Sequence, residues 1–170
     1  SGKVLTVPSQ DMVFGVYYLT MEKEGVDGEG RVFASFEDAL NAYDCRNNLD
    51  IQARISVRVS AENANVEEDG RKIFRTYTGR GEVQDFDVTE HSVRFETTVG
   101  RVIFNRQCLP ADYPYMNYKL VKGDISTLVN DCCDRYSVSV VEHILDAIKA
   151  EGLDAASRAE EGNSKYDFYF

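Results

Sequence analysis

The sequence has little that would let it cross a membrane. No apolar run approaches the roughly 18 to 20 residues that span a bilayer. The chain also shows no basic segment followed by an apolar segment and a small-residue cleavage site, which together mark a secretion signal. We therefore expect a protein without membrane partners that resides in the cytoplasm.

Basic side chains are also scarce. Lys and Arg number 19 against 29 Asp and Glu, which gives a formal net charge of -10. Affinity for a phosphate backbone comes mainly from clustered Lys and Arg. The charge balance therefore argues against autonomous nucleic-acid binding, and it makes electrostatic attraction of nucleoside triphosphates by this chain implausible.

Patterns of metal-binding or catalytic residues are missing as well. The four cysteines, Cys45, Cys108, Cys132 and Cys133, form no CxxC motif, and we expect reduced, partly buried thiols. Cys133 and His143 could in principle form a nucleophile pair, but a structural thiol and a surface imidazole fit their surroundings better. His91 has no second ligand in view, and the glycine-rich stretches match no phosphate-binding loop. We expect no catalytic residue and no metal site.

What the chain does contain is enough apolar material for a folded core. It has 170 residues, of which 43% are hydrophobic and 28% charged. This length fits one domain, or one compact domain with a satellite. The pattern of elements predicts an α+β fold, in which short helices and a small antiparallel sheet are followed by a C-terminal αα-hairpin.

The first strongly apolar segment is "VPSQDMVFGVYYLT", from Val7 to Thr20. Ser9 is a suitable N-cap and Asp11 lies in the first turn, where the helix dipole favours a carboxylate. The segment predicts a short helix with one apolar face, ending near Thr20. That face needs cover from the chain's own strands or from a neighbouring molecule. A second helix is expected from Phe36 to Tyr43, with Ser35 and Asp38 at capping-box spacing.

Strands are predicted in the middle of the chain. "LDIQARISVRVS" alternates apolar and polar residues and predicts a half-buried strand. "KIFRTYT" and "GEVQDFDV" are two short strand candidates that a hairpin would join, after a polar turn region "ENANVEEDGRK". A further strand is expected from Ser92 to Thr97, followed by a turn of helix capped by Thr98.

The last third has helical periodicity. Apolar residues recur at helical spacing from Ile125 to Tyr136, with Asp124 available as N-cap. Another helix is indicated from Val141 to Ile148 and is expected to close near Gly152. The connection at Ser137 to Ser139 is short, so the two helices should form a hairpin.

Several of these segments together carry a family resemblance. They are "VPSQDMVFGVYYLT", "GEGRVFAS" leading into "EDALNAYD", "ETTVGRVIFN", and "DISTLVNDCCDRYSVSVVEHILDAIKAEGL". In order, spacing and residue type they resemble one stretch of the β′ subunit of bacterial DNA-directed RNA polymerase. The resemblance covers the chain from about Gly2 to its end, although residues 62–88 carry no family motif and the tail at 159–170 opens with an acidic "AEEGN" in place of the family's usual continuation.

The resemblance implies a fragment of a larger enzyme. In that family this stretch follows the aspartate loop that holds the catalytic magnesium, and it lines the secondary channel for entering nucleotides and for the extruded RNA 3′ end. Residues 1–122 would be the pore or funnel region, and residues 123–170 the rim helices and tail. Partners would be the remaining polymerase subunits and channel-binding transcription factors such as the Gre-type cleavage proteins. Mg²⁺ would belong to the complete, nucleoid-associated enzyme, and the isolated fragment is predicted to be inactive.

The resemblance also suggests roles for individual residues. Five would lie near the active site: Gln10, Asp11, Thr97, Thr98 and Arg101. For Asp11, helix capping is an equally good explanation. Arg101 could meet a phosphate or pair with a carboxylate inside the fold, and the two readings stay open. Six charged residues of the hairpin would form the factor-docking surface: Asp124, Asp131, Asp134, Arg135, Glu142 and Asp146.

Two other classes of function remain as alternatives. The chain could be a stand-alone protein-interaction module that uses its C-terminal helical hairpin. The weakest alternative is a thiol enzyme using Cys133, which would predict rapid alkylation of that cysteine at neutral pH.

Overall fold

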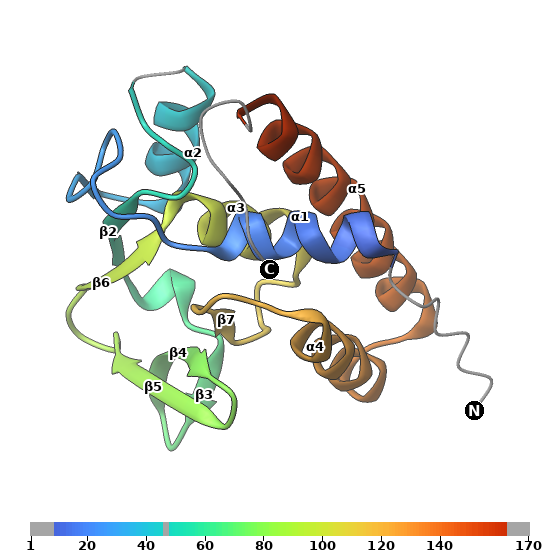
Figure 1. The fold of residues 1–170 in the computed structure, drawn as a ribbon. Helices are drawn as coiled ribbons and strands as arrows, with labels where there is room; N and C mark the ends of the chain where they lie inside the picture. The colour runs from blue at the N-terminus through green and yellow to red at the C-terminus, as the bar shows by residue number, and fades with distance from the viewer. Residues whose placement is uncertain (1–8, 46–47, 163–170) are drawn as a thin grey trace. The chain divides into compact units, whose positions relative to one another are not determined.

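A computed structural model of the chain describes residues 9–45 and 48–162 (Figure 1). Val7 and Pro8 of the opening stretch, and the tail after residue 162, lie outside the described residues. The chain divides into two compact units. The described parts of unit 1 are residues 9–18 and 120–162, and those of unit 2 are residues 19–45 and 48–119.

Unit 1 is built from helices. It contains most of α1 (Gln10–Thr20), together with α4 (Lys122–Arg135) and α5 (Val138–Gly162). α1 begins as predicted, because the Ser9 hydroxyl accepts a hydrogen bond of 3.1 Å from the backbone N–H of Met12. The expected C-terminal hairpin is confirmed as α4 followed by α5.

The apolar face of α1 lies against α5 within unit 1. A Cβ atom on Gly15 would overlap the carbonyl oxygen of Gly152, and one on Gly152 would lie 2.8 Å from the carbonyl oxygen of Met12. The two helix backbones therefore approach so closely that neither glycine has room for a side chain. Within unit 1 this face is covered by α5, a source of cover that differs from the strands or neighbouring molecule expected from the sequence.

This crossing also explains why α5 is longer than predicted. We expected the helix to close near Gly152, because glycine commonly follows a helix end. Instead α5 continues to Gly162. Gly152 is a packing residue inside the helix, so its low helix propensity is offset by the contact that it permits.

The start of α4 also differs from the prediction. Val121 occupies the N-cap position, and Asp124 is the third residue of the helix. The Asp124 carboxylate accepts a hydrogen bond of 2.9 Å from the backbone N–H of Val121 and is only 4% exposed. Asp124 therefore caps the helix from inside its first turn, as a carboxylate at this position commonly does.

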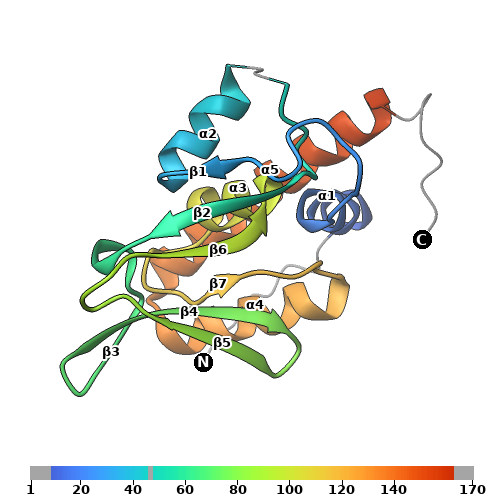
Figure 2. The same ribbon diagram turned by 90° about the vertical axis from the view of Figure 1, so that its left-hand side faces the viewer.

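Unit 2 contains two small sheets. In the first sheet the strand order is β1 (Val32–Phe33), β2 (Arg54–Val59) and β6 (Val93–Thr98). β1 is parallel to β2, and β2 is antiparallel to β6. In the second sheet β4 (Arg71–Gly79) pairs antiparallel with both β3 (Val66–Glu68) and β5 (Glu82–Asp87), and parallel with β7 (Tyr115–Met116). Figure 2 shows β2 and β6 side by side and the β4–β5 hairpin next to them.

The α+β class is confirmed, and the sheets correct one detail of it. The predicted β4–β5 hairpin and the alternating strand β2 are present, but β2 begins at Arg54 and not at the start of the alternating segment. Both sheets are mixed, because β1 and β7 each add a parallel pair. These two-residue strands have no periodicity that a sequence could reveal. The polar turn region contains a short 3₁₀ helix (Ala61–Asn63) and β3.

Two helices complete unit 2. α2 (Phe36–Asp44) is capped by the Ser35 hydroxyl, which accepts from the Asp38 N–H at 3.1 Å, as predicted. α3 (Val99–Cys108) follows β6 directly and is longer than the single turn expected. Its predicted cap is confirmed, since Thr98 Oγ1 accepts a hydrogen bond from the Arg101 N–H.

An aromatic cluster forms the core between the two sheets of unit 2. The ring centroids of Phe74 and Phe95 are 5.0 Å apart, and those of Phe95 and Tyr115 are 5.1 Å apart. Phe36 stacks on Tyr115 at 5.6 Å with an interplanar angle of 12°. Because these rings come from α2, β4, β6 and β7, the cluster joins elements that are distant in the sequence.

Candidate functional site

The segment "TTVGR" occupies the junction between β6 and α3. Thr97 and Thr98 are 1% and 0% exposed. The hydroxyl groups of Thr97 and Tyr115 share a hydrogen bond of 2.8 Å. Burial raises the pKa of Tyr115 above its ordinary value, so the phenol stays protonated and this bond joins two neutral groups. Both threonines therefore act inside the fold.

Arg101 projects from the first turn of α3. Its Nε donates a hydrogen bond of 2.8 Å to the backbone carbonyl of Thr20, the last residue of α1. Burial lowers the pKa of the guanidinium, although it remains charged at neutral pH. Within the described part of the chain, its terminal nitrogens make no hydrogen bond and no ion pair with a carboxylate. The guanidinium is thus fixed at one nitrogen and has donors left for another group.

Gly100, at the junction between β6 and α3, allows two other segments of unit 2 to approach the backbone closely. A Cβ atom at this position would overlap the carbonyl oxygen of Leu19 and would lie 3.2 Å from that of Ile51. The Gly100 N–H donates to the Ile51 carbonyl at 2.7 Å. The end of α1 and the turn before β2 therefore meet the N-terminus of α3, which places Arg101 beside Thr20.

The other residues proposed near an active site lie at the start of α1 in unit 1. Gln10 and Asp11 are both exposed, and Asp11 occupies the first turn. Asp11 is therefore in a position that favours a carboxylate by the helix dipole alone. The two alternatives stated for it, capping and ligand positioning, are both compatible with this place.

The six charged residues of the hairpin differ in their exposure. Asp134, Arg135, Glu142 and Asp146 are exposed, and Asp131 is half-buried. Arg135 Nε and Asp131 Oδ2 form an (i, i+4) ion pair of 3.1 Å. Asp124 is buried and serves as the cap of α4 described above.

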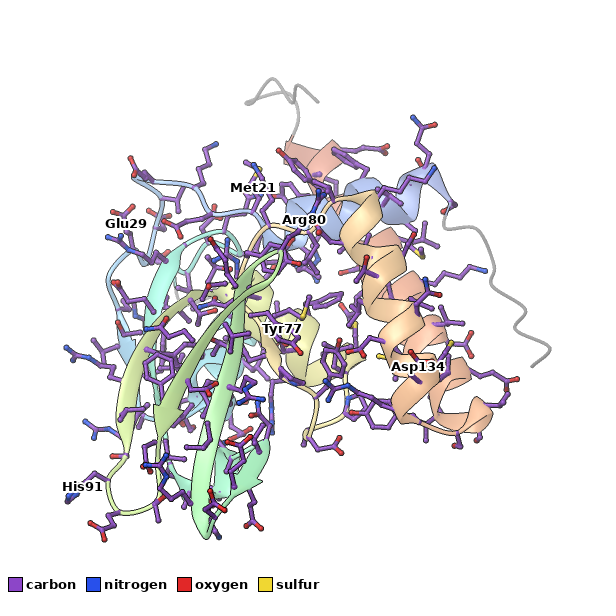
Figure 3. All side chains as sticks on the ribbon, turned by 90° about the horizontal axis from the view of Figure 1, so that it is seen from below. Met21, Glu29, Tyr77, Arg80, His91 and Asp134 are labelled. Atoms are coloured by element: carbon purple, nitrogen blue, oxygen red, sulfur yellow. The ribbon has the colours of Figure 1, made fainter. Side chains whose placement is uncertain are left out.

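Three residues were considered for metal or thiol chemistry: His91, Cys133 and His143. His91 projects outward from the loop between β5 and β6 (Figure 3), and His143 is exposed on α5. Cys133 is half-buried, and burial raises the pKa of the adjacent Cys132 to about 12. In residues 9–45 and 48–162, no three His, Cys, Asp or Glu side chains are grouped so that they could hold a metal ion.

The same described ranges contain no helix with the length and apolar character needed to cross a membrane.

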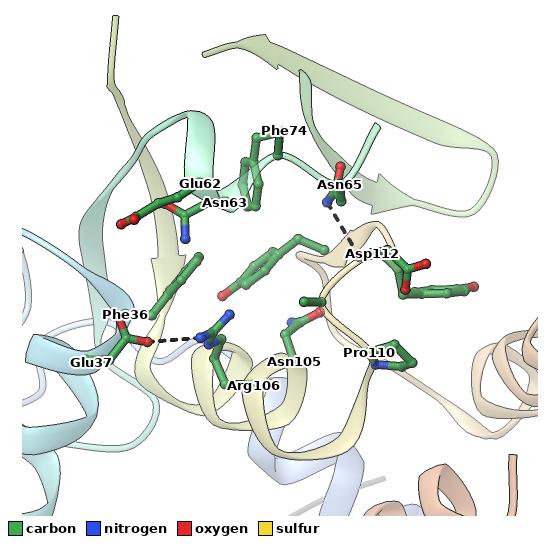
Figure 4. A pocket seen from close by; sticks show the side chains of 14 residues that line it. Phe36, Glu37, Glu62, Asn63, Asn65, Phe74, Asn105, Arg106, Pro110 and Asp112 are labelled. Atoms are coloured by element: carbon green, nitrogen blue, oxygen red, sulfur yellow. Dashed lines mark hydrogen bonds and ion pairs between the residues drawn. The ribbon is translucent and has the colours of Figure 1, made fainter. Parts of the chain in front are cut away.

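A cavity in unit 2 was not foreseen from the sequence. It has a volume of about 480 Å³ and lies between α2, the 3₁₀ helix, β4, the end of α3 and the loop before β7 (Figure 4). Phe36, Phe74 and Tyr115 of the aromatic cluster form its buried floor. Because the lining comes from several separate segments, no local motif could have indicated it.

Two asparagines hold the walls of this cavity. Asn105 donates through Nδ2 to the Met116 carbonyl at 2.9 Å and accepts through Oδ1 from the Met116 N–H at 2.8 Å. Asn65 makes the same pair of bonds with the backbone of Arg75, at 3.0 and 2.7 Å. Each amide thus satisfies a strand residue in the way that a neighbouring strand would. The cavity walls are therefore fixed by the fold itself.

Comparison with known proteins gives a consistent result. The family model described as "RNA polymerase Rpb1, domain 3" matches residues 1–160. The chain is 44% identical over 158 residues to the DNA-directed RNA polymerase subunit beta' of Acidothermus cellulolyticus, covering 93% of this chain and 11% of that protein. It is 40% identical to the same subunit of Bifidobacterium longum and 38% identical to that of Thermobifida fusca, covering 91% and 93% of this chain. The chain thus spans only about a ninth of the length of these relatives.

Proposed function

The chain belongs to the RNA polymerase Rpb1 domain 3 family, and from its similarity to bacterial β′ subunits we propose that it forms part of the secondary channel of DNA-directed RNA polymerase. The family recognised from the sequence motifs is thereby confirmed. The match over residues 1–160 carries this proposal. It does not favour the alternative of a stand-alone interaction module.

The proposal assigns the chain a role in transcription as channel wall and factor-docking surface. Nucleoside triphosphates and the RNA 3′ end would pass the pore region at residues 1–122, and transcription factors would dock on the rim helices at residues 123–170. The partners would be the other polymerase subunits. The complete enzyme would work in the cytoplasm, associated with the nucleoid.

Arg101 is the residue best suited to meet a phosphate in the channel. Its Nε bond to the Thr20 carbonyl orients the guanidinium, and its terminal nitrogens keep donors for a bidentate contact. Thr98 supports this role by capping the helix that carries Arg101, and Thr97 by anchoring β6 to Tyr115. We propose that Gln10 and Asp11, at the exposed start of α1, also lie near the active site.

The chemistry would come from other parts of the polymerase. Mg²⁺ would supply charge neutralisation for nucleotidyl transfer in the complete enzyme, and the described residues include no group of three or more His, Cys, Asp or Glu side chains that could hold it. We expect the isolated chain to incorporate no labelled nucleotide when it is given template, Mg²⁺ and triphosphates. Incorporation above a reaction without protein would contradict this assignment.

Factor docking can be tested in a complete enzyme. The segment would replace the matching segment in the β′ subunit of Thermobifida fusca, and the assembled polymerase would be assayed for RNA cleavage with a Gre-type factor. Glu142 and Asp146 are exposed and lie one helical turn apart on α5. The double change Glu142→Gln and Asp146→Asn should weaken factor-stimulated cleavage several-fold while elongation without the factor continues.

The matched control is Glu160→Gln, which removes an exposed carboxylate near the other end of α5. This variant should respond to the factor like the unmodified hybrid. Equal responses from the double variant and the control would refute docking at these residues. A hybrid subunit that fails to assemble would refute the placement of the segment itself.

A further inference from the structure

The cavity in unit 2 combines an aromatic floor with an acidic rim. Phe36, Phe74 and Tyr115 are between 3% and 4% exposed, whereas the side chains of Glu37, Glu62 and Asp112 reach the surface. Figure 4 shows Glu62 and Asp112 on opposite sides of the cavity, with Phe74 between them and Phe36 on the same side as Glu62. The volume of the cavity, about 480 Å³, falls within the range of volumes found for ligand-binding sites.

The net charge of the rim determines whether the cavity favours a cationic or an anionic ligand. Three carboxylates line the cavity against a single guanidinium, that of Arg106. Phosphate-bearing ligands are disfavoured by this balance, and cations are attracted.

One guanidinium, that of Arg106, is already bound at the cavity by an aromatic ring and a carboxylate. The Arg106 guanidinium carbon lies 5.3 Å from the centroid of the Phe36 ring, and Arg106 Nη2 donates a hydrogen bond of 3.0 Å to Glu37 Oε2. A planar guanidinium can stack on an aromatic ring and reach a carboxylate at the same time, which an ammonium does less well. Glu37 is paired with Arg106. Glu62 forms no ion pair or hydrogen bond within the described part of the chain.

Two of the three asparagines that line the cavity already have their side-chain amides engaged within the fold. The side-chain amide of Asn65 is hydrogen-bonded to the backbone of Arg75, and that of Asn105 to the backbone of Met116. Asn63 also lines the cavity, and its Oδ1 accepts from the Ser60 N–H. Recognition of a cation therefore comes from the rim carboxylates and the floor, and the fixed walls mean that the cavity need not rearrange on binding.

We propose that this cavity binds an arginine side chain of a polypeptide segment that lies outside this chain. The alkyl part of the side chain would cover the aromatic floor, and the guanidinium would bond to Glu62, with Asp112 adding to the negative field. The relatives are about eight times as long as this chain, so most of such a subunit lies elsewhere and could present the arginine. The proposal concerns the cavity alone and does not depend on the role of the chain in transcription.

A titration of the full 170-residue chain, labelled with ¹⁵N, would test this inference. The probe is the blocked peptide acetyl-Gly-Arg-Gly-amide, and the readout is the set of backbone amide chemical shifts. We expect saturable shifts at residues 62–65 and 111–113. The peptide with citrulline in place of arginine has the same shape without the charge, and it should bind at least fivefold more weakly. The lysine peptide should fall between the two.

Glu62→Gln should weaken the arginine peptide about threefold, as expected for the loss of one exposed ionic contact. Glu67→Gln is the matched control, because Glu67 is an exposed carboxylate on β3 that does not line the cavity. The amide spectrum of each variant reports whether its fold is retained.

Three results would overturn the proposal. The first is equal affinity for the arginine and citrulline peptides. The second is an unchanged affinity in Glu62→Gln, or shifts that fall outside the cavity. The third is tighter binding of adenosine monophosphate at the same residues, which would indicate a nucleotide site instead. Because no polymerase is present, none of these outcomes bears on the proposed function.

Discussion

The two units of this chain are stabilised by different means. In unit 1, α1 and α5 are joined by a close backbone crossing at Gly15 and Gly152. In unit 2, two mixed sheets are joined by an aromatic cluster and by asparagine side chains that complete strand pairing. The first arrangement depends on the absence of side chains and the second on particular side chains. The two units should therefore respond to different kinds of substitution.

The largest effect should come from Gly15→Ala in unit 1. The new Cβ would overlap the carbonyl oxygen of Gly152, so the helices must separate, at a cost of about 3 kcal/mol or more. Hydrogen exchange measured by mass spectrometry should show faster exchange in α5 than in the unchanged protein, with a smaller change in β4.

Gly123→Ala is the control, because Gly123 is exposed in the first turn of α4. Alanine favours helices, so this change should leave stability equal or slightly higher. If Gly15→Ala exchanged like this control, the close crossing would not be what stabilises unit 1.

Asn105→Ala should have the next largest effect, in unit 2. It removes three side-chain hydrogen bonds and leaves the buried N–H and carbonyl of Met116 without their partner. The expected loss is about 2 to 3 kcal/mol in the free energy of unfolding, measured by urea denaturation. Asn130→Ala, at an exposed position of α4, should change it by less than about 0.5 kcal/mol. Similar losses in both variants would argue against the asparagine clamp.

Helix caps allow a direct comparison between the units. Ser9 in unit 1 and Thr98 in unit 2 each accept a backbone hydrogen bond of 3.1 Å, but Ser9 is exposed and Thr98 is fully buried. Water can replace the exposed cap and not the buried one. We expect Ser9→Ala to cost about 0.5 kcal/mol and Thr98→Val, which keeps the shape of the side chain, about 1.5 kcal/mol. Equal losses in urea denaturation would contradict this difference.

The smallest effect concerns pH. Burial raises the pKa of Glu151 in α5, whereas hydrogen bonds from Thr89 lower that of Asp87 at the end of β5. The unfolded chain therefore ionises Glu151 above pH 4.5, whereas the folded chain keeps the proton until the pH reaches the raised pKa. Stability falls as the pH rises through this interval. Asp87 contributes stability above its ordinary value of 3.8, which is lost as the pH falls through its lowered pKa.

Glu151→Gln should therefore raise the melting temperature slightly at pH 7 and have little effect near pH 4. Asp87→Asn should lower it at pH 7 and have progressively less effect as the pH falls below 3.8. Thermal denaturation followed by circular dichroism at several pH values measures both. A Glu151→Gln variant that is less stable at pH 7 would show that burial of this carboxylate is not unfavourable.

Local features of the fold could be predicted from the sequence. The caps at Ser9, Ser35 and Thr98 were recognised because each hydroxyl acts on a backbone N–H three residues away. β2 and the hairpin of β4 and β5 followed from alternation and turn residues. Asp124 was placed on the right helix turn but at the wrong position, since a carboxylate serves at either the N-cap or the third residue.

The sites were less predictable. Arg101 was singled out through the family motif, but its bond to the Thr20 carbonyl joins residues that are far apart in the sequence. The cavity depends on Phe36, Phe74 and Tyr115 from three different elements, and on two asparagines whose amides could equally have faced solvent. No spacing rule reports such distant contacts.

The sequence by itself determined the helix caps at Ser9, Ser35 and Thr98, the α+β class and the family, because these depend on neighbouring residues and on motifs in a fixed order. Only the tertiary structure decided that Gly152 continues a helix, that β1 and β7 add parallel pairs, and that an aromatic cavity opens in unit 2. The physical reason is that close packing and buried hydrogen bonds depend on which distant segments meet.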